Sequence, residues 1–126
     1  MTKAPDIELA RVYDDLGATR GARLLVDRLW PRGISKDALK LDEWMKDLAP
    51  SSALRKWFGH DPDKWDAFAN RYRAELGESQ DAVERCLAWC RKGPVVLLYG
   101  ARDRDRNQAV VLRQYLRERL AREEAT

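Results

Sequence analysis

Histidine and cysteine are scarce in this chain of 126 residues, which contains one histidine and two cysteines. A structural zinc site normally takes four such ligands, so we expect no metal centre. Cys86 and Cys90 stand four positions apart, a spacing that matches neither a CxxC redox motif nor a zinc ribbon. We interpret them as small buried hydrophobic residues on one helix face, in preference to a metal or redox pair.

Long hydrophobic runs are also absent. No run approaches the roughly 20 apolar residues that a membrane span needs, and residues 1–15 lack the apolar core of a secretory signal. Two cysteines without an export signal are typical of a reducing compartment. We therefore expect a cytoplasmic protein without a membrane partner.

The short motifs that identify many enzymes are missing as well. The chain has no GxGxxG, GxxxxGK[ST], GxSxG or HExxH motif. No cysteine lies in a predicted strand-to-helix turn, so a thiolate nucleophile is unsupported. The sequence identifies no cofactor and leaves open whether the protein is an enzyme.

What is present is a globular composition, with 44% hydrophobic and 36% charged residues and a net charge of +3. We expect residues 1–126 to form a single domain with its own core. Lysine and arginine are spread along the chain beside aspartate and glutamate. This pattern favours a salt-bridged surface over a dedicated nucleic-acid surface, with a local basic cleft as the alternative.

Hydrophobic periodicity predicts an alternation of strands and helices. Strands are predicted at residues 7–13, 24–29 and 94–100, and helices from Asp61, across the segment that ends at Gly93, and from Asn107. The continuous apolar run at 94–100 is typical of the centre of a parallel sheet. Residues 41–48 fit either a helix or a short strand.

These elements predict an α/β fold, in which a small, mostly parallel sheet is flanked by helices. As an additional option, the prediction includes an antiparallel hairpin of the two N-terminal strands at one edge of the sheet. In open sheets of this class, ligands bind beyond the carboxyl ends of the strands. Two loops meet that description, namely residues 30–35 and residues 101–106.

The first loop follows a strand that carries an acid and a base, Asp27 and Arg28. A buried strand does not need these charges, whereas a ligand-facing loop does. In such a site Arg32 would grip a carboxylate or phosphate while Trp30 stacks on a ring. The alternative is that Trp30 belongs to the core and Arg32 pairs with Asp27.

The second loop reads GARDRDRN over residues 100–107 and resembles an anion-binding turn at a helix N-terminus. Its candidate ligand-binding residues are Arg102, Asp103 and Asn107, and its arginines would reinforce the helix dipole. The aspartates partly cancel that field. The alternative is a solvated turn in which Asn107 or Asp105 caps the helix.

His60, the single histidine, lies between two predicted helices. Histidine titrates near neutral pH and is therefore the natural acid–base group. With Asp27, it is our candidate for a catalytic residue. The alternative is a structural histidine at a helix junction, beside an Asp61 that caps the following helix.

Four blocks of the sequence carry a family resemblance. They are VDRLWPRG at 26–33, LAPSSALRKWFGHDPDKW at 48–65, FANRYRAEL at 68–76 and VVLLYGARDRDRNQAVVL at 95–112. Together they resemble the family called domain of unknown function 488, in its YeaO-like branch, and they cover almost the whole chain. The resemblance implies no established activity.

Other branches of that family look to have a Cys-His-Arg triplet entering the last helix. The corresponding residues 105–107 of this chain are Asp-Arg-Asn. The resemblance therefore implies that the thiol and the imidazole of that triplet are lost here and that an arginine is kept.

Our leading hypothesis is a protein that binds an anionic small molecule, such as a nucleotide or a phosphorylated metabolite, at the strand-end loops. Arg28, Arg32 and Arg55 would hold the charge, and Asp27 and His60 would exchange protons. A second hypothesis is a nucleic-acid or protein-interaction module. Its basic face would consist of Arg71, Arg73, Arg85, Arg91 and Lys92. A third is a structural adaptor in which the charged pairs only hold loops together.

Overall fold

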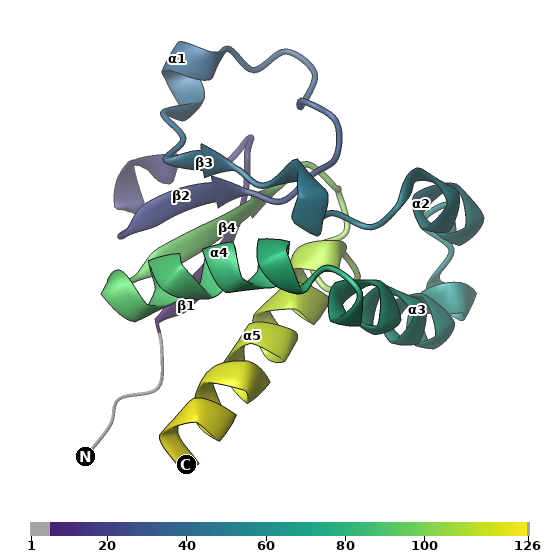
Figure 1. The fold of residues 1–126 in the computed structure, drawn as a ribbon. Coiled ribbons are helices and arrows are strands. Elements are labelled where there is room, and N and C mark those ends of the chain that lie inside the picture. The colour runs from purple at the N-terminus through teal and green to yellow at the C-terminus, as the bar shows by residue number, and fades with distance from the viewer. Residues whose placement is uncertain (1–5, 126) are drawn as a thin grey trace.

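The computed structural model describes residues 6–125, whose four strands form one parallel sheet (Figure 1). The strands are β1 (Ile7–Arg11), β2 (Ala22–Leu25), β3 (Glu43–Trp44) and β4 (Val95–Tyr99). Their order across the sheet is β1-β4-β2-β3, so the last strand of the chain lies between the first two. The parallel sheet confirms the predicted α/β class, with β4 in the predicted central position.

Helices connect and flank these strands. They are α1 (Lys36–Leu39), α2 (Ser52–Phe58), α3 (Trp65–Gly77), α4 (Gln80–Lys92) and α5 (Gln108–Ala125), with single 3-10 turns at Leu16–Ala18, Lys46–Leu48 and Pro62–Lys64. Across residues 6–125, no helix is both long and apolar enough to span a membrane.

The antiparallel N-terminal hairpin does not form, so this option of the prediction is wrong. β1 runs parallel to β4 with Ile7 opposite Val95, and β2 lies parallel to the other edge of β4 with Ala22 opposite Val95. All five side chains of β4 are buried. Because β4 offers apolar surface and hydrogen-bonding groups on both edges, β1 and β2 flank it instead of pairing with each other.

The ambiguous segment at 41–48 is divided between two short elements. Glu43–Trp44 add the edge strand β3, and Lys46–Leu48 form a 3-10 turn. The indole N–H of Trp44 donates to the carbonyl oxygen of Asp27 at 2.8 Å. This bond ties the segment to the chain that leaves β2.

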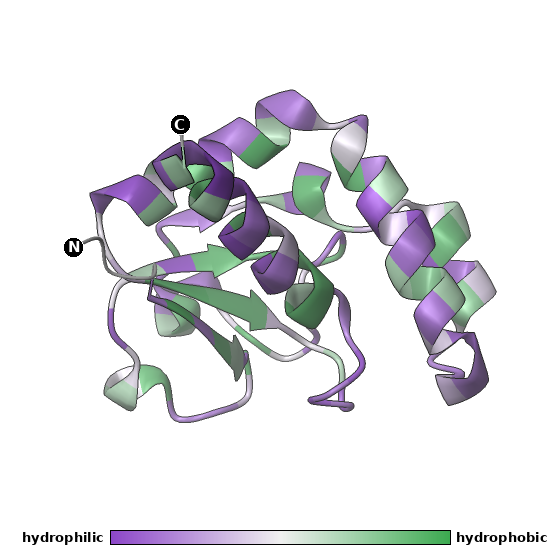
Figure 2. Ribbon diagram, turned by 90° about the horizontal axis from the view of Figure 1, so that it is seen from below, coloured by the Kyte–Doolittle hydropathy of each residue, from purple (hydrophilic) through white to green (hydrophobic). Residues whose placement is uncertain are grey.

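The two faces of the sheet are covered differently. Val95, Leu97 and Tyr99 of β4 pack into the main core against helices α3, α4 and α5. Val96 and Leu98 point to a smaller core that includes Leu16 and Leu39. Figure 2 shows the strands mainly in the colour of hydrophobic residues and the helices in alternating colours, as expected for helices that bury one face.

An aromatic cluster fixes α2 and α3 beside the carboxyl edge of the sheet. The rings of Phe58 and Phe68 stack with centroids 4.2 Å apart, and Phe68 contacts Tyr72 at 6.0 Å. The buried hydroxyl of Tyr72 donates to the carbonyl oxygen of Leu48 at 2.5 Å. The α2–α3 pair is thereby held as a wall next to the strand ends.

Candidate functional site

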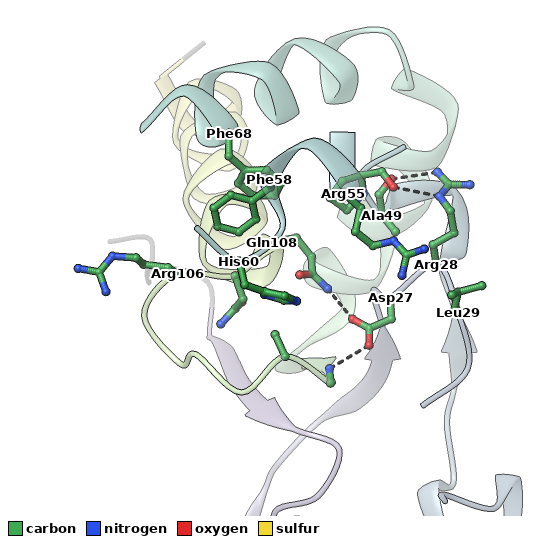
Figure 3. A pocket seen from close by; sticks show the side chains of 14 residues that line it. Asp27, Arg28, Leu29, Ala49, Arg55, Phe58, His60, Phe68, Arg106 and Gln108 are labelled. Carbon is green, nitrogen blue, oxygen red and sulfur yellow. Dashed lines mark hydrogen bonds between the residues drawn. The ribbon is translucent and has the colours of Figure 1, made fainter. Parts of the chain in front are cut away.

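A pocket of about 240 Å³ lies where β2 and β4 end, under the wall formed by α2 and α3 (Figure 3). Its lining comes from residues 27–29, 49–50, 100–101 and 106–108, together with side chains of α2 and α3 and His60. The pocket thus lies beyond the carboxyl ends of parallel strands, where the fold class predicts a ligand site.

Asp27 lies at the base of this pocket, two residues after the end of β2. Its carboxylate accepts a hydrogen bond from the backbone N–H of Gly100 at 2.9 Å and another from the side-chain amide of Gln108. A Cβ atom on residue 100 would lie 2.9 Å from the same carboxylate. Glycine at the end of β4 is therefore what allows the carboxylate to approach the strand so closely.

Burial raises the pKa of Asp27 from 3.8 to about 6, and the hydrogen bonds from Gly100 and Gln108 and the positive charge of Arg55 only partly oppose this effect. Both hydrogen-bond donors are neutral. Within the described residues, Asp27 forms no ion pair. The carboxylate is therefore charged at neutral pH without a contacting counter-ion, and it titrates near the physiological range.

Two arginines of the pocket, Arg28 and Arg55, differ in their hydrogen-bond partners. Arg28 donates to the carbonyl oxygens of Pro50 at 2.9 Å and Ala49 at 3.2 Å, which secures the loop before α2. Arg55, on α2, is exposed, and its guanidinium forms no hydrogen bond to the described part of the chain. Arg55 is thus the arginine of α2 whose donors are available to a ligand.

His60 occupies a left-handed backbone conformation with φ of 57°, directly after Gly59 with φ of 52°. Such a conformation costs a non-glycine residue roughly 1–2 kcal/mol. The double left-handed step ends α2 and turns the exposed imidazole toward the pocket, 6.0 Å from the ring of Phe58 (Figure 3). Strain of this kind is concentrated at functional sites.

The turn at 101–107 is occupied by its own side chains. The carboxylate of Asp103 accepts from the backbone N–H groups of Asp105 at 2.9 Å and Arg106 at 3.0 Å, which also lower its pKa. Asn107 accepts from the N–H groups of Ala109 and Val110 and so caps α5. The donors that an anion would use are therefore satisfied internally, as in the alternative of a capped turn.

The structure brings together five of the nine predicted site residues. Asp27, Arg28, Arg55, His60 and Asn107 line the pocket, joined by Arg106 and Gln108, whereas Trp30, Arg32, Arg102 and Asp103 do not line it. The segment after β2 therefore lines the pocket with residues 27–29, and the loop beyond them, with Trp30 and Arg32, lies outside it.

Trp30 and Arg32 lie away from the pocket for identifiable reasons. The indole N–H of Trp30 donates to the carbonyl oxygen of Ile34 at 2.6 Å, and its ring meets that of Trp44 edge-on at 5.3 Å. Trp30 is thus part of the smaller core, as the alternative reading held. Arg32 is exposed, and among the described residues it makes no ion pair with Asp27.

Sequence reasoning missed Gly100 and Gln108, which hold the Asp27 carboxylate. Gly100 ends the predicted central strand, and Gln108 is the first residue of the last helix. Both positions are at the predicted ligand edge of the sheet. The overlooked signal is their position: hydrogen-bond donors at the end of one strand and at the start of the following helix lie close to a polar side chain at the end of the neighbouring strand.

The proposed basic face consists largely of arginines that already have partners. Arg73 pairs with Glu118, Arg85 with Glu43, and Arg91 with Glu84 and Glu123. The guanidinium of Arg71 lies over the ring of Trp57 at 4.0 Å, and the ammonium of Lys92 lies over the ring of Trp89 at 5.2 Å. This arrangement matches a salt-bridged surface. On residues 6–125, no three histidine, cysteine or acidic side chains cluster as a metal site would require.

Comparison with known proteins identifies the relatives of the chain. Residues 6–126 match a family model described as the inactive DUF488-N3 subclade. The chain is 43% identical over 112 residues to the uncharacterized protein YeaO of Escherichia coli, covering 89% of this chain and 97% of YeaO. It is 40% identical over 116 residues to the uncharacterized protein Rv3073c of Mycobacterium tuberculosis, covering 92% of this chain and 98% of that protein. No solved structure matches significantly.

Proposed function

Because this chain belongs to the DUF488 family, in the YeaO-like subclade described as inactive, we propose that it binds a small anionic molecule in the β2–β4 pocket without transforming it. The observation that carries the proposal is the guanidinium of Arg55, which lines a concave site and has no acidic partner among the described residues. Arg55 comes from α2 and His60 from the turn after it, whereas Arg106, in the loop before α5, pairs with the carboxylate of Asp103 at 3.7 Å. Arg55 thus supplies positive charge to the pocket, and the imidazole of His60 adds a hydrogen-bonding group beside it.

The surroundings of Arg55 favour a bound anion over a surface ion pair. Arg55 has no acidic partner among the described residues, whereas Arg104 of the neighbouring loop is already paired with Asp14 at 2.6 Å. A concave, partly apolar site strengthens a charge interaction relative to open solvent. The apolar part of the lining includes Phe58 and Phe68, which suits a ligand with an organic portion.

The loss of thiol chemistry also supports binding without catalysis. In the resemblance to other family branches, a Cys-His-Arg triplet corresponds to Asp105-Arg106-Asn107 of this chain. Of these, Arg106 and Asn107 line the pocket. Asp27 and His60 remain the two groups of the site that are able to exchange protons with a bound ligand.

A thermal-shift panel tests the proposal, with inorganic phosphate, sugar phosphates, nucleotides, S-adenosylmethionine, carboxylic acids, amino acids and short single-stranded RNA as probes. A ligand at 100 times its dissociation constant adds about 2.7 kcal/mol, which raises the Tm of a domain of this size by several degrees. We expect a shift with at least one small anion that is lost in Arg55→Ala. Arg32→Ala is the matched control because its guanidinium is exposed outside the pocket.

Two results would overturn the proposal. One is the absence of any shift with every small anion in the wild-type protein. The other is an equal shift in Arg55→Ala and the wild type, since the ligand would then bind elsewhere. A shift with RNA alone, weakening steeply with salt, would support the nucleic-acid hypothesis instead.

A further inference from the structure

We infer that the ligand of this pocket is a zwitterion, whose ammonium group pairs with Asp27 while its acidic group is held by Arg55 and His60. The inference rests on the proposed function and specifies the ligand class. It concerns a group that the binding of a simple anion does not explain, namely the Asp27 carboxylate at the base of a site whose lining includes Arg55 and His60.

The Asp27 carboxylate is left with unused acceptor capacity. An ionised carboxylate has about four lone-pair sites for hydrogen bonds. Gly100 and Gln108 donate to one oxygen each, and both donors are neutral. Buried charges in proteins are normally paired with an opposite charge. The remaining acceptor sites belong to a carboxylate that lines the pocket, where a ligand reaches it.

The neighbouring arginines do not act as the counter-ion of Asp27. Arg28 directs two of its donors to the carbonyl oxygens of Pro50 and Ala49. Arg55 acts on Asp27 through its charge, but the two form no ion pair in the described part of the chain. A purely anionic ligand would place a second negative charge beside Asp27. A ligand with an ammonium group removes that repulsion and neutralises the carboxylate.

The position of the carboxylate is fixed before any ligand binds. The backbone N–H of Gly100 belongs to the end of β4, and Gln108 is the first residue of α5. Figure 3 shows the carboxylate held by these two donors at the strand end and facing Arg55 and His60 across the pocket. A preorganised charge of this kind loses little conformational entropy on binding. The raised pKa of Asp27 has the same origin, since burial without a cation destabilises the charged form.

The size of the pocket limits the ligand. Its volume of about 240 Å³ is many times the roughly 10–15 Å³ of such space that one water molecule needs. This space fits one ring or a short chain between the two charged groups, with Phe58, Phe68 and Pro50 as the apolar walls. The geometry therefore points to an amino acid with an apolar side chain or an aminoalkyl phosphate.

Titration calorimetry with matched pairs of ligands tests this inference. Phenylalanine is compared with 3-phenylpropanoate, and phosphoethanolamine with ethyl phosphate, so that each pair differs by one ammonium group and the two pairs differ in the acid. We expect the zwitterion of at least one pair to bind the wild type about tenfold more tightly, or better, than its partner. Asp27→Asn should abolish this preference, and Arg32→Ala should keep it.

The outcomes separate the inference from the proposed function. Equal or tighter binding of the simple anions, or a preference that survives in Asp27→Asn, would overturn the zwitterion and leave an anion site in place. Failure of all four compounds to bind while another anion of the thermal-shift panel binds would do the same. If no anion of either experiment binds, both proposals fail. The comparison within the wild type decides the matter even where Asp27→Asn folds poorly.

Discussion

The backbone N–H of Gly100 donates a hydrogen bond to the carboxylate of Asp27 at 2.9 Å, which joins the end of β4 to the chain that leaves β2. Because the two strands are neighbours in the sheet, this bond closes the carboxyl edge at the base of the pocket. Both residues are thus needed for the shape of the site, and each can be tested separately.

Gly100→Ala should destabilise the protein. The new Cβ atom would lie 2.9 Å from the Asp27 carboxylate, so the side chain or the strand end must shift, at a cost of about 1–3 kcal/mol. Gly77→Ala at the end of α3 is the control, because a Cβ there meets no described atom within 4 Å. Urea denaturation measures both variants. Equal free energies of unfolding for the two would show that the close approach is not a constraint.

Asp27→Asn should stabilise the protein at neutral pH. The pKa of Asp27 is raised from 3.8 to about 6 in the folded state, so the folded state binds more protons than the unfolded state between these values. Stability of the wild type therefore falls as the pH rises from about 4 to about 6. The neutral amide avoids this loss. Its oxygen accepts from Gly100, and the side-chain amide of Gln108 must turn so that its own oxygen accepts from the new NH2 group. With these weaker bonds, the net gain is on the order of 1–2 kcal/mol.

The measurement for this variant is the free energy of unfolding of both proteins as a function of pH. We expect the advantage of Asp27→Asn to be present at pH 7 and to disappear below about pH 4, where the carboxyl is protonated in both states. If the variant is less stable than the wild type at pH 7, other groups of the folded protein offset the cost of burying the Asp27 charge, which contradicts the prediction.

His60→Gly should weaken anion binding without loss of stability. Glycine adopts the left-handed conformation freely, so relief of strain at φ of 57° offsets the greater entropy of the unfolded chain. We expect a free energy of unfolding equal to the wild type or higher by up to about 1 kcal/mol. Lys40→Gly is the control, since Lys40 has φ of 50° and does not line the pocket. Unchanged affinity in His60→Gly would remove His60 from the site.

Tyr72→Phe should lower the free energy of unfolding by about 1–2 kcal/mol, because the carbonyl of Leu48 loses its buried donor. Tyr13→Phe removes a comparable bond to the carbonyl oxygen of Arg32 at 2.9 Å on the exposed surface. Water replaces that bond, so we expect a change below about 0.5 kcal/mol. Thermal or urea unfolding compares the two. Similar losses of stability in the two variants would mean that the buried hydrogen bond of Tyr72 contributes no more than the exposed one of Tyr13.

The sequence predicted the parts of the fold that depend on local pattern. The apolar run of β4 and the capping position of Asp61 before Pro62–Lys64 both follow from residue type and position. The hairpin was wrong because the pairing of β1 depends on which strand offers the larger buried surface. That competition between distant segments leaves no local signal.

The site was predictable at the level of the sheet edge but not of single side chains. Asp27 and Asn107, which line the pocket, were predicted as site residues because charged or polar groups at strand ends and helix starts are conspicuous. The sequence left Trp30 as either a stacking platform or a core residue, because its partner Trp44 lies in a segment whose structure was also left open. The sequence analysis predicted that the backbone N–H groups of the second loop would bind a ligand. Asp103 accepts two of these hydrogen bonds instead, and this contact depends on the exact path of the turn.

Amide chemical-shift mapping by NMR tests the central claim most directly, with inorganic phosphate and phosphoethanolamine titrated into the labelled protein. The account predicts saturable shifts for the backbone amides of His60 and Gly100 and for the side-chain amide of Gln108, with the amide of Arg32 unaffected. Saturable shifts centred on another surface, or none with either compound at millimolar concentrations, would contradict the β2–β4 pocket as the binding site.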